Sequence, residues 1–221
     1  RQLQVNLHCS RLLRIFAILI NHGTMEKNRI MVRDARPSDA PAIARLIVMA
    51  WPVEVFLEHG RKRTVEDLVE LVTDIVSREE TLYSYTNTVV AEDCIPDTGP
   101  AVVGAMIGYD GADLHRLRRP VEEEFIRRFG ASDMKWSDET QAGEFYFDSV
   151  AVDPAYRGCG IGSSLFEAMS ERARSMGYPV AGLLVDFDNP SAEKLYTRLG
   201  FRTVGGKDFF GHSMKHMQKN L

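Results

Sequence analysis

The segment 144–176 constrains the fold of this chain more than any other part of the sequence. Residues 144–152 form an apolar, aromatic-rich run, a short loop then brings in Gly158, Gly160 and Gly162, and an amphipathic stretch follows directly. This order predicts a strand, a tight loop and a helix. Because glycines let the backbone approach an anion and a helix N-terminus favours negative charge, the loop predicts a site for phosphate groups.

Two familiar nucleotide-binding loops do not fit these glycines. The Walker-type loop of nucleoside triphosphatases places Lys and then Ser or Thr after its last glycine, whereas Ser163 and Ser164 follow Gly162 here. The dinucleotide fingerprint needs Gly-x-Gly-x-x-Gly near the start of a parallel sheet, whereas this loop lies late in the chain with every second residue a glycine. What remains is Arg157-x-x-Gly-x-Gly, in which the Arg157 guanidinium is a charged donor for a phosphate.

A second motif gives the loop a more specific interpretation. It runs from Asn189 to Phe201, reads Asn-Pro-Ser-Ala-Glu-Lys-Leu-Tyr-Thr-Arg-Leu-Gly-Phe, and begins 27 positions after Gly162. In this order the two motifs resemble the coenzyme A loop and the late helix of the GCN5-related N-acetyltransferase (GNAT) superfamily. The resemblance covers residues 30–217, and its specific part is 144–201.

The resemblance implies a reaction and a co-substrate. It implies an enzyme that uses acetyl-CoA and no metal, in which a primary amine attacks the acetyl thioester directly within a ternary complex. The acceptor amine would be a small molecule or a peptide, and a homodimer is compatible with the family. The alternative is a non-catalytic acyl-CoA-binding or regulatory module with the same fold.

The resemblance also implies cofactor contacts, residue by residue. The backbone of Val150 and Val152 would pair with the pantetheine arm as a further strand would, and Asn189 would hydrogen-bond near it. The residues around the pyrophosphate would be Arg157, Gly158, Cys159, Gly160, Gly162 and Ser163. Cys159 is interpreted as a small loop-filling residue rather than as a nucleophile, because no His partner is apparent in the local sequence.

Three side chains are candidates for the proton transfers of such a reaction. Tyr196 matches the family's general acid, and a phenol is protonated at neutral pH, so it can protonate a departing thiolate. An incoming ammonium must lose a proton, which requires a carboxylate or an ordered water as base. Asp148 best matches the family's acidic position on this strand, and Glu144 is the second choice. Strict alternation places both carboxylates on one strand face with Val150 and Val152.

The acceptor side of the reaction is less clear from the sequence. The segment 110–143 is a helical insertion between two predicted strands, and its mixed charges fit either a solvated surface helix or a lid over the acceptor site. Trp51, Tyr109, Trp136 and the loop 54–59 are acceptor-side candidates by position, with core packing as the alternative for each.

Apolar periodicity and turn residues divide the rest of the chain into strands and helices. The predicted strands are 29–34, 88–92, 101–109, 144–152, 180–185, 201–204 and 213–217. The predicted helices are 42–50, 64–77, 163–176 and 191–199. Together with the resemblance, this order predicts an α/β (α+β layered) fold with a mixed, mostly antiparallel sheet of about six to seven strands flanked by helices.

Composition limits the partners and the location. With 221 residues, 44% of them hydrophobic, and a net charge of -4, the chain suits one globular domain and has no basic surface for nucleic acid. Three scattered cysteines predict reduced thiols in a cytoplasmic protein rather than a disulfide framework or a metal site. Residues 1–24 are interpreted as a leader or a non-native extension, and 25–221 as a single domain. The apolar run 12–20 is too short to cross a membrane.

Overall fold

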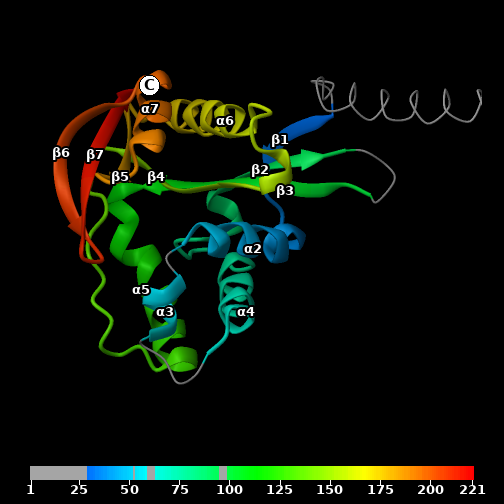
Figure 1. The fold of residues 1–221 in the computed structure, drawn as a ribbon, viewed down its shortest axis with the longest axis vertical. Helices are drawn as coiled ribbons and strands as arrows, with labels where there is room; N and C mark the ends of the chain where they lie inside the picture. Colours follow the sequence, from blue (N-terminus) through cyan, green and yellow to red (C-terminus); the bar gives the residue numbers. More distant parts are fainter. Residues whose placement is uncertain (1–28, 52, 59–62, 95–98) are drawn as a thin grey trace, which may run out of the picture.

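A seven-stranded sheet forms the centre of the structure, a computed structural model that describes residues 29–51, 53–58, 63–94 and 99–221 (Figure 1). The strands are β1 Ile30–Asp34, β2 Thr88–Asp93, β3 Ala101–Asp110, β4 Phe145–Val152, β5 Val180–Asp186, β6 Arg202–Phe209 and β7 His212–Asn220. Their order is β1-β2-β3-β4-β5-β7-β6, and neighbours are antiparallel except for β4 and β5. The predicted mixed, mostly antiparallel sheet is confirmed, while the predicted leader lies outside the described residues.

Helices cover the two faces of this sheet as separate layers (Figure 1). One face carries α2 (Ala40–Ala50), α3 (Val53–Glu58), α4 (Val65–Val76) and α5 (Leu114–Phe129), and the other carries α6 (Ile161–Ser175) with α7 (Pro190–Arg198). Each layer has its own buried apolar cluster, so the sheet separates two cores. In the part of the chain that the structure describes, none of these helices has the length and apolar character of a membrane span.

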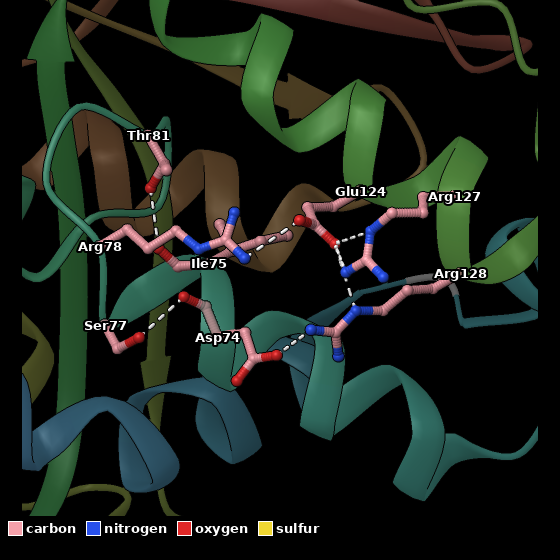
Figure 2. A network of polar contacts seen from close by, with 8 residues as sticks. All are labelled: Asp74, Ile75, Ser77, Arg78, Thr81, Glu124, Arg127 and Arg128. Carbon is pink, nitrogen blue, oxygen red and sulfur yellow. Dashed lines mark hydrogen bonds and ion pairs between the residues drawn. The ribbon is translucent and has the colours of Figure 1, made fainter.

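The predicted insertion contains α5, and this helix belongs to the core rather than to the solvated surface. One of its faces buries Leu114, Leu117, Val121, Phe125 and Phe129. At the edge of this face Glu124 accepts a hydrogen bond from Arg78 (3.0 Å) and pairs with Arg128, which also contacts Asp74 of α4 (Figure 2). These contacts hold α5 against α4 and thereby position the segment that leads into β4.

A β-bulge interrupts the central strand. Ile107 of β3 pairs with Ser149 of β4, but the next residue, Gly108, pairs with Phe147. Asp148 is therefore an extra residue in β4 with no opposite partner in β3. A bulge of this kind bends the strand and redirects the side chain that it carries.

The bulge corrects the predicted alternation of β4. Tyr146 and Ala151 pack in the core beneath α2 and α4, although one is an even and the other an odd position. Val150 and Val152 pack on the opposite side of the sheet, toward α6. The prediction that 144–152 alternates strictly, with Val150 and Val152 on the same face as Tyr146, is wrong, because the inserted residue shifts the alternation by one position.

Candidate active site

β4 and β5 diverge soon after they meet. Their pairing, as far as the structure describes it, consists of Phe145 with Ala181 and Tyr146 with Gly182. Beyond these pairs lies a cavity of about 580 Å³. Its wall includes, from both cores, Met106, Tyr146, Phe147, Asp148, Ser149, Val150, Phe166, Leu183, Leu184, Asp186 and Tyr196. The gap between the strands therefore connects the two faces of the sheet, so that ligands from opposite sides can meet there.

Within the described residues, no strand pairs with the edge of β4 that faces this gap. The Asp153 N–H donates to the Val103 carbonyl of β3 (2.9 Å), and residues two positions apart on an antiparallel strand bond to the same neighbour. Ala151 therefore bonds toward β3, whereas the N–H and C=O groups of Val150 and Val152 point to the side where β5 has moved away. The strand-like contact of both valines with pantetheine stays a prediction.

The loop between β4 and α6 turns on two glycines in the left-handed region, Gly158 (φ 80°) and Gly160 (φ 82°), where a side chain would strain the backbone. The Arg157 guanidinium Nε donates to the Val152 carbonyl (3.3 Å). The amides in the first turn of α6 have no intrahelical partners, and the N-cap residue, Gly160, supplies no side-chain bond to them. The space beside Gly162 is open, since a Cβ there would meet nothing within 4 Å. The loop thus combines exposed donors with room for an anion.

Tyr196 forms part of the cavity wall from α7. Its ring packs against Phe166 of α6 and against Phe201, with centroids 5.4 and 6.3 Å apart. Burial raises the pKa of Tyr196 above the usual value of a phenol. The hydroxyl is therefore protonated at neutral pH and is able to donate that proton into the cavity.

Asp148 lines the same cavity and begins a chain of polar contacts that leads behind the wall. Its Oδ2 accepts a hydrogen bond from the Tyr109 hydroxyl (3.0 Å), and its Oδ1 accepts one from the Ser149 hydroxyl (2.6 Å). The Tyr109 hydroxyl also lies 3.1 Å from Oε1 of Glu139. The guanidinium of Arg118, which is buried, donates to Oε2 of Glu139 (2.6 Å).

Two carboxyl groups thus meet at one phenol. A hydroxyl has a single hydrogen, so Tyr109 donates a well-directed bond to only one of Asp148 and Glu139. The other contact is favourable when that carboxyl carries a proton and donates to the phenol oxygen. Burial raises the pKa of Asp148, and burial together with the nearby Asp148 charge raises the pKa of Glu139 to about 7. The pair therefore shares one proton up to about pH 7.

Glu144, the second candidate for the base, lies outside this cavity wall. Its carboxylate is buried and accepts hydrogen bonds from Thr140 (2.7 Å) and Gln218 (2.8 Å), and it lies 2.8 Å from Nε2 of His216. A Cβ on Gly182 would come within 2.0 Å of it. Burial raises the pKa of Glu144, but these hydrogen bonds outweigh burial and hold the pKa below its usual value. The structure therefore does not bring Glu144 together with Asp148. Instead, the Glu144 carboxylate, just before β4, contacts His216 and Gln218 of β7.

The other predicted cofactor residues are exposed. Asn189 caps α7, since its Oδ1 accepts a hydrogen bond from the Ala192 N–H (3.1 Å). Cys159 has a free, exposed thiol, and Ser163 is exposed in the first turn of α6. Within the described ranges, no group of three or more His, Cys, Asp or Glu could hold a metal ion. The structure gives Asn189 a capping role, and its contact with pantetheine stays a prediction.

Of the acceptor-side candidates, Trp51 and Trp136 line the cavity, as does Phe56 from the predicted loop 54–59. Residue 59 itself lies outside the described residues. Tyr109 does not form part of this wall but holds Asp148 from behind. The segment that follows α5 thus contributes Trp136 to the cavity wall. From the sequence, a place over the acceptor site was one of two alternatives for the insertion, and a solvated surface helix was the other.

Sequence reasoning missed Glu139 and Arg118. One signal could have found Arg118, because it falls on the same face of α5 as Leu114, Val121 and Phe125, at spacings of three and four residues. A charged residue on a buried helix face requires a partner of opposite charge. That partner, Glu139, lies in an irregular segment where no periodicity marks it.

Comparison with known proteins shows which family this chain resembles in sequence and in fold. The model of the acetyltransferase (GNAT) family matches residues 103–201. A solved structure described as an acetyltransferase is 32% identical, with a TM-score of 0.70, and the match covers 86% of this chain and 98% of that one. The N-acetyltransferase from Staphylococcus aureus Mu50, with 24% identity and a TM-score of 0.69 over 85% of this chain and 99% of that one, shares the fold.

A curated relative matches over a shorter length. The mycothiol acetyltransferase of Nocardiopsis dassonvillei is 42% identical over 65 residues, which are 29% of this chain but only 19% of that protein. The likeness to a 32% identical acetyltransferase over almost its entire length is more decisive, because sequence and fold agree throughout. Together with the family model across β3, β4 and α6, it shows that the chain belongs to the acetyltransferase (GNAT) family.

Proposed function

We propose that this protein is an acetyl-CoA-dependent N-acetyltransferase, in which a primary amine attacks the acetyl thioester directly in a ternary complex. One observation carries the proposal: a single cavity, between the diverging strands β4 and β5, has both Asp148 and Tyr196 in its wall. A carboxyl group and a protonated phenol in one cavity supply the proton acceptor and the proton donor that amide formation from a thioester requires.

The residues around the gap fit coenzyme A. The backbone edge at Val150 and Val152, which pairs with no described strand, suits an extended pantetheine arm. The arm would bind as an added strand does and would take the place of the Arg157 side chain at the Val152 carbonyl. Arg157 and the first-turn amides of α6, beside the open space at Gly162, suit a pyrophosphate. When bound there, acetyl-CoA supplies an electrophilic thioester carbonyl.

Asp148 is the proposed base. An amine arrives as an ammonium ion and must lose a proton before its nitrogen lone pair can attack. The Asp148 carboxylate, or a water that it orders, accepts that proton. Its orientation comes from Tyr109 and Ser149, and its proton affinity depends on Glu139 beyond the Tyr109 hydroxyl. Glu144 has no part in this step, because its carboxylate is enclosed elsewhere.

Tyr196 is the proposed acid. Its hydroxyl donates a proton to the departing thiolate, which otherwise would leave as an anion in a largely apolar cavity. The raised pKa of Tyr196 keeps the phenol protonated at neutral pH, so a proton is available when the thiolate forms.

The first test is amine-dependent release of a thiol. The protein would be incubated with acetyl-CoA and with representatives of several amine classes, and free CoA thiol would be measured. We expect at least one amine to accelerate thiol release well above the rate with acetyl-CoA alone. The alternative, a non-catalytic acyl-CoA-binding module, predicts the opposite result: CoA binds in a calorimetric titration, but no amine releases thiol.

A second test addresses the pyrophosphate contact. Arg157→Ala should weaken CoA binding about 10-fold, because an exposed charge-assisted hydrogen bond contributes near the lower end of the usual range of about 1.5–3 kcal/mol. S-acetylpantetheine, which has no phosphate groups, is the matched control ligand and should bind the variant and the wild type equally. Equal CoA affinity of both proteins in calorimetry would exclude Arg157 from the pyrophosphate site.

A further inference from the structure

The acceptor side of the cavity has an aromatic wall. Its members come from segments far apart in the sequence: the end of α2, α3, the segment after α4, the segment after α5, and the turn between β6 and β7. They are Trp51, Phe56, Tyr83, Trp136, Phe209 and Phe210. None of these belongs to the backbone edge or the glycine loop that suit coenzyme A.

The rings form one continuous surface. Trp51 stacks on Phe56 with centroids 4.9 Å apart, and it lies 5.0 Å from Tyr83. Phe210 reaches Phe56 (6.1 Å) and Trp136 (6.0 Å), so the β6–β7 turn closes the surface from the other side. Phe210 (φ 48°) and Gly211 (φ 79°) form the two-residue turn of this hairpin, in which both central residues take a positive φ.

The charged part of the wall is acidic. Glu139, Asp148 and Asp186 line the cavity, and no Lys or Arg among the described residues does so. His212 lies 3.0 Å from Asp186, and Arg118 contacts Glu139 from behind while only 3% of its side chain is exposed. Above about pH 7, where Asp148 and Glu139 no longer share a proton, a cation entering the cavity therefore meets net negative charge. A carboxylate on the acceptor would have no described Lys or Arg of the wall as counter-charge, and the His212 that lines the wall is already beside Asp186.

The negative charge is also concentrated. Asp148 and Glu139 lie at the same Tyr109 hydroxyl, beside the bulge of β4. One ammonium group fits this end of the cavity, and the rest of the acceptor then lies against aromatic rings. Amino sugars need many hydrogen-bonding partners that such a wall lacks, and a polyamine would place further charges against it.

We infer that the acceptor is a primary ammonium carried on a flat apolar or aromatic body that has no carboxylate. This inference rests on the proposed function and specifies the substrate class of the same cavity. The rings bury the apolar body and attract the ammonium through their π faces, and Asp148 receives its proton.

The test compares matched amines in the thiol-release assay. Phenethylamine represents the inferred class, ethylamine lacks its ring, phenylalanine adds a carboxylate, and phenylalaninamide adds similar bulk without that charge. Glucosamine and spermidine represent polar and polycationic acceptors. We expect kcat/KM for phenethylamine to exceed the value for ethylamine at least about 10-fold, because a buried ring contributes that much, and phenylalanine to fall well below phenylalaninamide.

The outcomes separate this inference from the function on which it rests. A higher kcat/KM for glucosamine, spermidine or phenylalanine than for phenethylamine would overturn the inferred class and leave an N-acetyltransferase. No thiol release with any amine would refute the proposed function, and the acceptor class with it.

A pair of variants tests the aromatic wall directly. Trp51→Leu should raise KM for phenethylamine about 10-fold with little change in kcat or in KM for ethylamine, because only the ring loses its contact surface. Tyr85→Leu is the matched control, since this tyrosine bonds to Glu79 and does not line the cavity. Trp136→Leu serves as a second variant if Trp51→Leu unfolds at a lower temperature. Equal losses for both amines would contradict recognition of the acceptor body by the wall.

Discussion

The Tyr196→Phe variant should lose about 100- to 10,000-fold in kcat while its affinity for CoA stays that of the wild type. The substitution removes only the hydroxyl, so the ring keeps its contacts with Phe166 and Phe201. Without the phenol proton, the thiolate must leave as an anion, which slows turnover but does not affect binding of the cofactor. Steady-state kinetics with an amine from the screen and calorimetry with CoA measure the two quantities separately.

A matched substitution controls for the loss of a phenol as such. Tyr178 also donates a hydrogen bond from its hydroxyl, to Asp110 at 2.7 Å, but it does not line the cavity between β4 and β5. Tyr178→Phe should therefore keep the wild-type kcat. If Tyr196→Phe also kept it, Tyr196 would not be the general acid.

The Glu139→Gln variant should move the acid limb of the kcat/KM profile to lower pH. In the wild type the Asp148–Glu139 pair takes up one proton below about pH 7, and Asp148 cannot accept a proton from the ammonium whenever the shared proton lies on its own carboxyl group. Glutamine preserves the hydrogen-bonding shape but removes one negative charge, and the Arg118 charge, which is still paired with Asp138 (3.1 Å), is then no longer offset by Glu139. Both changes lower the pKa of Asp148, so the variant stays active at lower pH.

Asp148→Asn provides the contrast. It should reduce kcat/KM about 100- to 10,000-fold at every pH, because no carboxylate then remains in contact with the ammonium. A pH profile of Glu139→Gln that coincided with the wild-type profile would show that the two carboxyl groups titrate independently.

Stability offers a readout of the same pair that needs no acceptor. A free glutamate has a pKa near 4.5, whereas the pKa of Glu139 in the folded protein is about 7. Between these values the folded protein holds a proton that the unfolded chain releases, so the pair's contribution to the free energy of unfolding falls as the pH rises. Urea titrations across this range should show a smaller fall for Glu139→Gln than for the wild type.

Local sequence patterns predicted most strands and helices closely. The strand predicted at 101–109 is Ala101–Asp110, and the helix predicted at 64–77 is Val65–Val76, which begins with a capping box between Thr64 and Asp67. Such elements carry their own signal, because an apolar period and a cap lie within a few residues of each other.

Elements that depend on distant partners were predicted less well. β6 extends to Phe209, whereas the sequence predicted 201–204, because Gly205 and Gly206 have weak strand propensity and pair only through β7. α3, with six residues, was not predicted at all, since a segment so short carries little periodic signal. Tertiary contacts supply what these segments lack locally.

By itself the sequence determined the family and the strand–loop–helix order of the coenzyme A loop, because both follow from short motifs whose residues lie next to one another in the chain. Only the tertiary structure decided which carboxyl group reaches the cavity. The bulge at Asp148 comes from its register with β3, and the enclosure of Glu144 comes from contacts with β7. The meeting of Asp148 with Glu139 at Tyr109 joins residues 30 and 39 positions apart. No local pattern encodes such contacts, because they form only when separate segments pack together.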